Sequence, residues 1–292
     1  MNSPRMGREL PRICALTGAS GYVGSRIRYA LEANGWRVVA LLRRTPQIPN
    51  DISWSLDCQH SITEELCQHS VAALVHAAWD FTQVRPGDIE RVNVQGSVRL
   101  FEQAVSAGVR RIVFISSMSA YPQAHSLYGR AKMAVERAAR NLAAVVIRPG
   151  LVYGDRPGGV FGSMQQIVSK SSLIPIIGDG SYPQYLVHED DVGSAVVSAL
   201  NAESVSTEPV SVAHPEPWPF RRLIEKIAKS QSQRVRLVPV PWWFIFGGLR
   251  LAEMMGVRLA FRSDSVVSLV YPNPHLQFNC ARGLGVEPRP FS

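Results

Sequence analysis

The chain has 292 residues, of which 46% are hydrophobic and 18% are charged, and its formal net charge is +8. This composition excludes a largely disordered chain, and the length predicts one large domain with a smaller lobe. The lysines and arginines are dispersed and form no basic run interleaved with aromatic residues, so we expect no nucleic-acid partner. The positive charge instead indicates affinity for anionic small molecules.

Cysteine spacing and apolar runs indicate a metal-free protein of the cytoplasm. No CxxC pair occurs, and neither His76 nor His188 is at metal-ligand spacing from a cysteine. The longest apolar stretch, residues 238–249, is about half the roughly 20 residues of a membrane span and contains two prolines. We therefore expect no membrane contact. Residues 1–11 lack the apolar region of a secretory signal and are expected to be a flexible lead-in.

The first element expected in chain order is a strand over residues 12–17. A glycine-rich loop follows, and residues 21–33 then carry apolar side chains at helical spacing until Asn34 and Gly35. The next apolar run, residues 36–42, reads as a buried strand. Strand, loop, helix and strand together predict the βαβ unit of a mononucleotide-binding half.

The loop TGASGYVG, residues 17–24, is the candidate cofactor loop. Its glycines recur at three-residue intervals, which allows a tight turn, close approach of the backbone to a pyrophosphate, and a helix N-terminus aimed at that anion. An ordinary glycine turn is the alternative, but the position between a strand and a helix favours a dinucleotide. The loop residues assigned to the cofactor are Gly18, Gly21, Tyr22, Val23 and Gly24.

Arg43 and Arg44 stand where an NAD-selective site has an acidic residue, about 20 residues past the loop. Two guanidinium groups can pair with a 2′-phosphate and offer no acceptor to a free ribose hydroxyl. The pair therefore favours NADP as the cofactor, with NAD left open. A solvated pair in a turn is the alternative.

Residues 71–78, 111–116 and 143–147 are further apolar runs, each preceded by a segment of helical character. This rhythm predicts an α/β protein with a Rossmann-type, doubly wound parallel sheet over residues 12–150. Past residue 150, prolines and glycines cluster repeatedly, as in an irregular lobe. We expect residues 151–292 to form mainly a C-terminal substrate-binding lobe, with a segment around 183–213 returning to the core.

Tyr128 and Lys132 are the candidate catalytic pair. Residues four apart on a helix share one face, so the ammonium group can lie close to the phenol. A nearby positive charge favours the phenolate and is expected to lower the tyrosine pKa, which suits proton exchange with a substrate hydroxyl or carbonyl. A surface pair without function is the alternative for this spacing.

With these residues in place, the chain resembles the extended short-chain dehydrogenase/reductase family, also called the NAD-dependent epimerase/dehydratase family. The resemblance runs nearly end to end. Besides TGASGYVG and YGRAK, the matching segments are LDC at 56–58, VHAA at 75–78, VNVQG at 92–96, ISSMSAY at 115–121, IRPG at 147–150 and VHEDD at 187–191.

The resemblance implies a role for each matching residue. Ser117 matches the serine that orients the reacting oxygen, with Ser116 and Ser119 as competitors, and Lys132 matches a lysine that also binds the nicotinamide ribose. Asn93 is implied to support the site from its helix. The other residues implied at the cofactor are Asp57, Cys58, Ala77, Ala78 and Pro149.

Two departures bear on the substrate. Many nucleotide-sugar epimerases of the family have Asn where Gly150 stands and Arg where Gln184 stands. Losing that guanidinium removes a phosphate contact, although Arg156, Arg221 or Arg222 could replace it. A nucleotide sugar is therefore one of the substrates left open.

The aromatic residues of 242–246 are expected to pack in the core or a lid, and an interfacial patch for a membrane or a lipid-linked substrate is the alternative.

These observations predict an NADP-preferring oxidoreductase of the cytoplasm that moves hydride between nicotinamide and a carbinol or carbonyl carbon of a small or sugar-type substrate. Ser117, Tyr128 and Lys132 form its expected catalytic set, and no metal is expected. An NAD-dependent nucleotide-sugar epimerase or dehydratase is the alternative enzyme. A non-catalytic NAD(P)-binding regulatory protein is the second alternative, and a homodimer is left open.

Overall fold

The computed structural model describes residues 12–43, 50–156, 158–202, 208–257 and 261–292. The expected lead-in at 1–11 and Arg44 lie outside these ranges. Within them, no helix is both long enough and apolar enough to cross a membrane.

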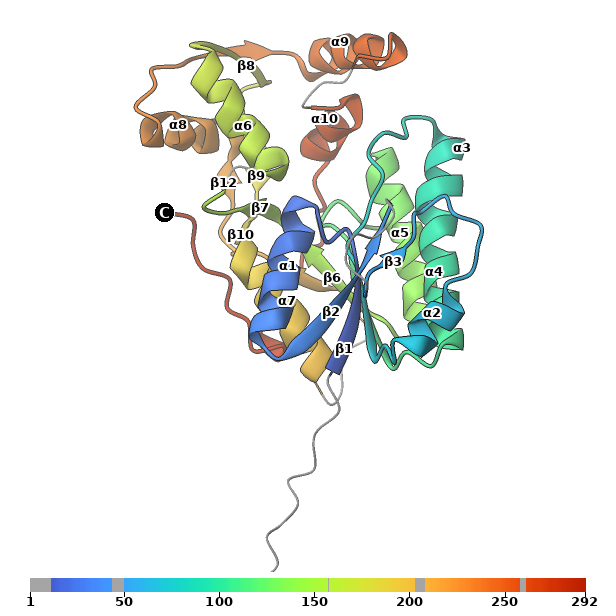
Figure 1. The fold of residues 1–292 in the computed structure, drawn as a ribbon. Coiled ribbons are helices and arrows are strands. Elements are labelled where there is room, and N and C mark those ends of the chain that lie inside the picture. Colours follow the sequence, from blue (N-terminus) through green and yellow to red (C-terminus); the bar gives the residue numbers. More distant parts are fainter. Residues whose placement is uncertain (1–11, 44–49, 157, 203–207, 258–260) are drawn as a thin grey trace, which may run out of the picture.

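A seven-stranded parallel sheet forms the centre of the large domain (Figure 1). Its strand order is that of a doubly wound sheet, because β2 and β3 lie on one side of β1 and the later strands, beginning with β4, lie on the other side. The sequence-based prediction of a Rossmann-type fold is therefore confirmed. Across the sheet the strands are β11 (Val210–Val212), β6 (Val145–Pro149), β5 (Arg111–Ile115), β4 (Ala73–His76), β1 (Arg12–Thr17), β2 (Trp36–Leu42) and β3 (Ile52–Ser53).

The central strands are mainly apolar on both sides because both faces of the sheet are covered. In β1, Cys14 and Leu16 join one buried cluster while Ile13 and Ala15 join the cluster on the opposite face. Successive side chains of a strand point to opposite faces, so a strand covered on both sides reads as a continuous apolar run and not as an alternating one.

Helices cover the two faces of the sheet in separate groups (Figure 1). One face carries α1 (Tyr22–Ala33) and α7 (Glu189–Asn201), which pack against each other. The other carries α2 (Thr63–Gln68), α4 (Gln95–Ser106) and α5 (Leu127–Asn141). A short helix, α3 (Pro86–Asp88), and a π-helical turn, η1 (Ile89–Val94), lead into α4.

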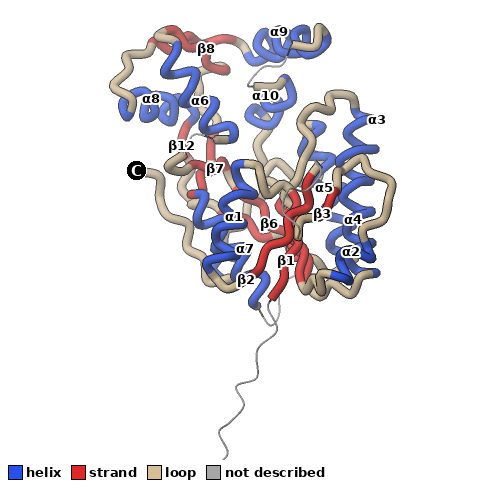
Figure 2. Tube along the Cα trace, viewed as in Figure 1, coloured by secondary structure: helices blue, strands red, loops and turns tan. Residues whose placement is uncertain are grey.

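The small lobe has its own apolar core above the large domain (Figure 2). Its short strands pair two by two, which explains the irregular texture of this part of the sequence. The pairs are β7 (Leu151–Tyr153) with β10 (Leu186–His188), β9 (Pro183–Gln184) with β12 (Trp218–Pro219), and β8 (Leu173–Ile177) with β13 (Arg236–Val240). The lobe helices are α6 (Gly159–Lys170), α8 (Phe220–Ser230), α9 (Trp242–Met254) and α10 (Ser263–Val270).

The C-terminal half of the chain contributes to both parts of the molecule. After β10 the chain enters the large domain through α7 and β11, and the last helix, α11 (Asn279–Gly283), also contacts β11. Arg289 closes this arrangement with an ion pair to the buried Asp191 of α7 at 2.7 Å. The sequence analysis did not anticipate that the C-terminal residues pack on the large domain.

Candidate active site

A cavity of about 860 Å³ lies between the sheet edge and the small lobe. Its wall includes residues from both parts of the molecule, among them the ends of β4, β5 and β6 and the inner sides of α9 and α10. In a doubly wound sheet the carboxyl ends of the strands form the binding crevice. The sequence-predicted site residues that line this cavity are Tyr22, Val23, Ala77, Ser117, Tyr128, Lys132 and Pro149.

The glycine loop has the geometry that a dinucleotide requires. Gly18 has φ of +69°, and a Cβ atom placed there would lie 3.0 Å from the backbone nitrogen of Ala78. A Cβ on Gly24 would collide with the carbonyl of Gly18, so only glycine permits this turn. Gly21 precedes α1, and no side chain caps the N-terminus of that helix. The backbone cradle and the uncapped helix end fit a pyrophosphate.

A buried hydrogen-bond chain holds the ends of β1 and β4 together below this loop. Thr17 Oγ1 accepts from the backbone N–H groups of Ala77 and Ala78, both at 3.0 Å. Its own proton therefore points to His76 Nδ1 at 2.8 Å, and the other ring nitrogen bonds Ser97 Oγ at 2.8 Å. Burial lowers the pKa of His76 to about 3, so the ring is neutral. Sequence analysis missed Thr17 and Ser97 because no local pattern links them.

Asn93 does not line the cavity and instead holds the loop that follows β4. It is fully buried in η1, where its side chain accepts from the N–H of Asp80 at 2.7 Å and donates to the carbonyl of Asp80 at 3.0 Å. These two bonds fix the loop after β4. A π-helical turn at such a position often accompanies a functional site.

Other predicted cofactor residues lie outside the cavity wall. Asp57 is exposed and accepts from Ser55 Oγ at 2.6 Å, and Cys58 beside it is half-buried with a free thiol. Arg43 is exposed directly after β2. Burial acts to raise the Asp80 pKa, but hydrogen bonds from Gln83 and Thr82 and the charge of Arg43 hold that pKa below its ordinary value.

Ser117, Tyr128 and Lys132 converge at the floor of the cavity. Tyr128 and Lys132 share one face of α5, and Ser117 follows β5 and hydrogen-bonds the Tyr128 phenol. Lys132 Nζ donates to the carbonyl of Ile115 at 2.8 Å. Rings of Trp79 and Phe81 pack against Tyr128 with centroids 5.5 and 5.8 Å away. The three groups predicted as a catalytic set therefore meet in one apolar enclosure.

The pKa of Tyr128 moves in the direction opposite to the one expected from its spacing to Lys132. Burial raises the pKa of Tyr128 to about 12, against a smaller lowering by the Ser117 hydrogen bond. The Lys132 ammonium lies over the Tyr128 ring, 5.8 Å from its centroid. Burial also lowers the pKa of Lys132 to about 7, opposed by the charge of Glu136. Desolvation outweighs charge proximity at both groups.

A buried ion pair anchors α5 to the sheet. Glu136, only 1% exposed, accepts from Arg148 Nε at 2.8 Å and Nη2 at 2.5 Å. Ser116 Oγ donates to the same carboxylate. Ser116 is thereby occupied, which leaves Ser117 as the better placed of the two neighbouring serines.

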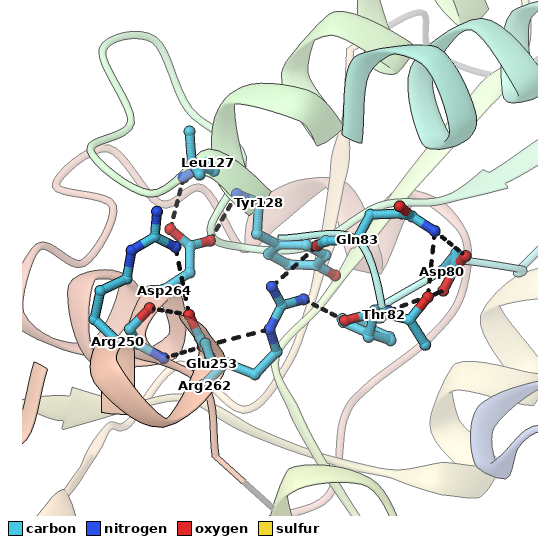
Figure 3. A network of polar contacts seen from close by, with 11 residues as sticks. Asp80, Thr82, Gln83, Leu127, Tyr128, Arg250, Glu253, Arg262 and Asp264 are labelled. Atoms are coloured by element: carbon cyan, nitrogen blue, oxygen red, sulfur yellow. Dashed lines mark hydrogen bonds and ion pairs between the residues drawn. The ribbon is translucent and has the colours of Figure 1, made fainter. Parts of the chain in front are cut away.

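The small lobe caps α5 from the other side of the cavity. Asp264 of α10 accepts from the backbone N–H groups of Leu127 and Tyr128, both at 2.8 Å (Figure 3). Figure 3 also shows Arg262, which donates to the carbonyls of Phe81 and Gln83, beside Glu253 of α9. Sequence analysis missed this network because its members are far apart in the chain.

The charged side chains of the cavity wall have partners within the protein. Arg250 and Arg262 lie beside Glu253, whose carboxylate also accepts from Ser263. The rest of the lobe wall is mainly apolar and includes Met164, Ile176, Phe220, Ile245, Phe246 and Leu249.

The structure shows what surrounds Gly150 and Gln184, the two positions that depart from the nucleotide-sugar pattern. A Cβ on Gly150 would collide with the carbonyl of Tyr185, so the backbone there leaves no room for a larger side chain. Gln184 lines the cavity and bonds the carbonyl of Pro183. The candidate replacements Arg156, Arg221 and Arg222 belong to the described residues and do not line the cavity. Arg221 instead donates to the carbonyl of Asp179 at 2.9 Å.

The fold, the glycine cradle and the convergent side chains define an NAD(P)-binding protein of the doubly wound class. The model of the NAD dependent epimerase/dehydratase family matches residues 14–213, and the chain belongs to this family.

Two relatives with different activities resemble the chain to the same degree. The ceramide reductase of Caulobacter vibrioides is 24% identical over 81% of this chain and 76% of its own. The UDP-glucose 4-epimerase of Vibrio cholerae is 24% identical over 83% of each chain. Among solved structures, MoeE5 in complex with UDP-glucuronic acid and NAD superposes with a TM-score of 0.68 at 22% identity, over 94% of this chain and 97% of that chain. That likeness extends the agreement in fold to the small lobe.

Proposed function

We propose that the protein is an NAD(P)-dependent oxidoreductase that transfers hydride between the nicotinamide and a carbinol or carbonyl carbon, with reduction as its main direction. The observation that carries this proposal is the meeting of Ser117, Tyr128 and Lys132 in one cavity that also reaches the glycine loop. A bound NAD(P)H would supply the hydride, and the glycine cradle together with Tyr22 and Val23 would hold it.

Ser117, Tyr128 and Lys132 have separate roles in the proposed reaction. The Ser117 hydroxyl orients the substrate oxygen, and the Tyr128 phenol gives its proton to that oxygen as negative charge develops there. A tyrosine with a pKa near 12 is fully protonated at neutral pH, which suits an acid in the reducing direction. Lys132, held by the Ile115 carbonyl, positions the phenol and the ribose side of the site.

The cofactor preference is proposed to be NADP. Arg43 stands exposed at the end of β2, at the sequence position where an NAD-selective site has an acidic residue. Titration of the purified protein with NADPH and NADH tests this preference, and Arg43→Ala should weaken NADPH binding more than NADH binding. Equal or tighter binding of NADH by the unaltered protein would remove the inference.

The substrate is proposed to be an apolar alcohol or carbonyl compound. An apolar lobe wall offers burial to hydrocarbon, and a nucleotide diphosphate would need cationic groups that here are already paired with Glu253. The resemblance to a ceramide reductase supports the same class. The resemblance to UDP-glucose 4-epimerase keeps a nucleotide-sugar epimerase as the second candidate.

One comparison of substrates separates the candidates. NADPH oxidation is followed with aliphatic ketones and aldehydes of increasing chain length, and product formation from UDP-glucose is followed in parallel. We expect kcat/KM to rise with chain length, because each buried CH₂ contributes about 0.8 kcal/mol. Turnover of UDP-glucose without turnover of any apolar compound would establish the epimerase instead. Absence of both, with intact NADPH binding, would favour a non-catalytic regulatory role.

A further inference from the structure

Helix α9 exposes an apolar face that nothing in the described structure covers. Trp243 and Phe244 are 55% and 60% exposed and stack on each other with centroids 4.0 Å apart. Leu251 and Met254 continue this face, and Met254 is 76% exposed. No residue of α9 is fully buried. Phe246 lines the cavity, as a lid residue would, whereas Trp243 and Phe244 face outward as the interfacial alternative requires. This outer face consists of Trp243, Phe244, Gly247, Gly248, Leu251, Met254 and Met255.

Unlike an ordinary surface helix, α9 carries large apolar side chains on its outer side as well as on the side that faces the cavity. Arg250 and Glu253 take part in the polar network at the cavity, while large apolar side chains face outward (Figure 3). A Cβ on either Gly247 or Gly248 would have no neighbour within 4 Å, so no other segment among the described residues packs there. Soluble proteins seldom leave a contiguous apolar face of this kind without a partner.

The same helix connects this outer face to the cavity. Ile245, Phe246 and Leu249 lie on the inner side of α9 and form part of the cavity wall. Helix α9 therefore lies between the exposed outer face and the apolar wall of the cavity.

The chain segment that leads into α9 is rich in basic residues. Residues 220–257 contain seven lysines and arginines against two acidic residues. Lys229, Arg234 and Arg236 are exposed, and β13, which begins at Arg236, runs directly into α9. An exposed apolar helix that follows an exposed basic segment combines the two features that bind anionic lipid surfaces.

We propose that the outer face of α9 docks on the surface of an anionic phospholipid bilayer, and that the apolar substrate passes from the bilayer to the cavity past this helix. The second clause rests on the proposed function, and the first does not. A second copy of the chain is the weaker occupant, because a two-fold contact would set this basic region against itself. One helix face is also small beside the roughly 800 Å² that a stable interface buries on each partner.

The docking is tested by vesicle flotation with the full chain and no cofactor or substrate. Vesicles of phosphatidylcholine and phosphatidylglycerol in equal amounts are compared with pure phosphatidylcholine. We expect binding to the anionic vesicles that weakens in high salt, and a loss of about tenfold or more in the Trp243→Ser/Phe244→Ser variant. Tyr29→Ser is the matched control, since Tyr29 is an exposed aromatic residue of α1, and it should bind as the unaltered protein does.

A second variant, Met254→Gln/Met255→Gln, guards against misfolding of the first, and circular dichroism and Tm verify both. Failure of the unaltered protein to bind anionic vesicles, or equal binding by folded variants, overturns the proposal. A dimer that the same variants convert to monomers in light scattering, without vesicle binding, would assign the face to self-association and also overturn it. Reduction of soluble short-chain carbonyls is measured without vesicles, so the proposed function stands or fails separately.

Discussion

Asp264, on the small lobe, accepts a hydrogen bond at 2.8 Å from the backbone N–H of Tyr128, on the catalytic face of α5 (Figure 3). The first turn of α5 belongs to the large domain, and its capping carboxylate comes from the small lobe. The N–H groups of a first helical turn have no partner within the helix, so a carboxylate there both satisfies them and complements the helix dipole. The lobe that lines the cavity therefore also holds the proposed acid in place.

Asp264→Ala should destabilise the protein by about 1.5 to 3 kcal/mol, since it removes two hydrogen bonds to a charged group. A lower kcat with a smaller change in cofactor Kd is expected, because the phenol loses its anchor while the glycine cradle is untouched. Urea unfolding and steady-state kinetics measure both effects. Asp88→Ala, which breaks the surface ion pair with Arg91, is the control and should change stability by less than about 1 kcal/mol. An unchanged kcat in Asp264→Ala would show that the cap is only structural.

Tyr128→Phe should reduce kcat by about 10²-fold to 10⁴-fold, because it removes the proton donor and leaves the ring packing against Trp79 in place. Single-turnover NADPH oxidation on an identified substrate measures the effect. NADPH binding and Tm should stay close to those of the unaltered protein. Turnover at the original rate would sink the proposed mechanism.

Lys132 should make stability depend on pH. Its pKa is about 7 in the folded protein, against an ordinary value of 10.5 in the unfolded chain. The unfolded state therefore binds more protons between these values, and the destabilisation by Lys132 is largest below pH 7 and shrinks as pH rises. Lys132→Met should be more stable than the unaltered protein at pH 6, with a smaller difference at pH 9.

Urea unfolding of both proteins from pH 6 to 9 checks this dependence. The range stops at pH 9 because Tyr128 titrates above it. Its pKa is about 12 in the folded protein against an ordinary value of 10.0, so the unfolded chain loses this proton first and stability falls as pH rises above 10. A stability difference that stays constant across the range would show that Lys132 keeps its ordinary pKa.

Glu136→Gln should destabilise the protein by about 3 to 5 kcal/mol, because it leaves Arg148 charged and nearly buried without its partner. The double variant Glu136→Gln/Arg148→Met should recover part of this loss, since no charge then remains unpaired. Chemical unfolding of the two single variants and the double variant gives the coupling energy. Glu32→Gln, which breaks the exposed pair with Arg28, is the control and should change stability by less than about 1 kcal/mol. Strict additivity at the buried pair would contradict the argument.

Local patterns in the sequence were enough to predict the parallel sheet, the glycine loop and the shared helix face of Tyr128 and Lys132. Apolar runs, glycine spacing and helical periodicity all arise from residues close in the chain, and covered strands and tight turns constrain those residues directly. The resemblance then singled out Ser117, which the structure places beside Tyr128.

Tertiary contacts decided the features that depend on distant residues or on burial. Asp264 reaches Tyr128 across 136 positions of the chain, and no local pattern announces such a contact. The raised pKa of Tyr128 follows from desolvation, which only packing creates, and charge proximity predicted the opposite direction. The sequence left open whether the aromatic residues of 242–246 pack in a core or lid or form an interfacial patch. The structure places Phe246 in the cavity wall and Trp243 and Phe244 outside, because hydrophobicity identifies a face that needs a partner but not which partner covers it.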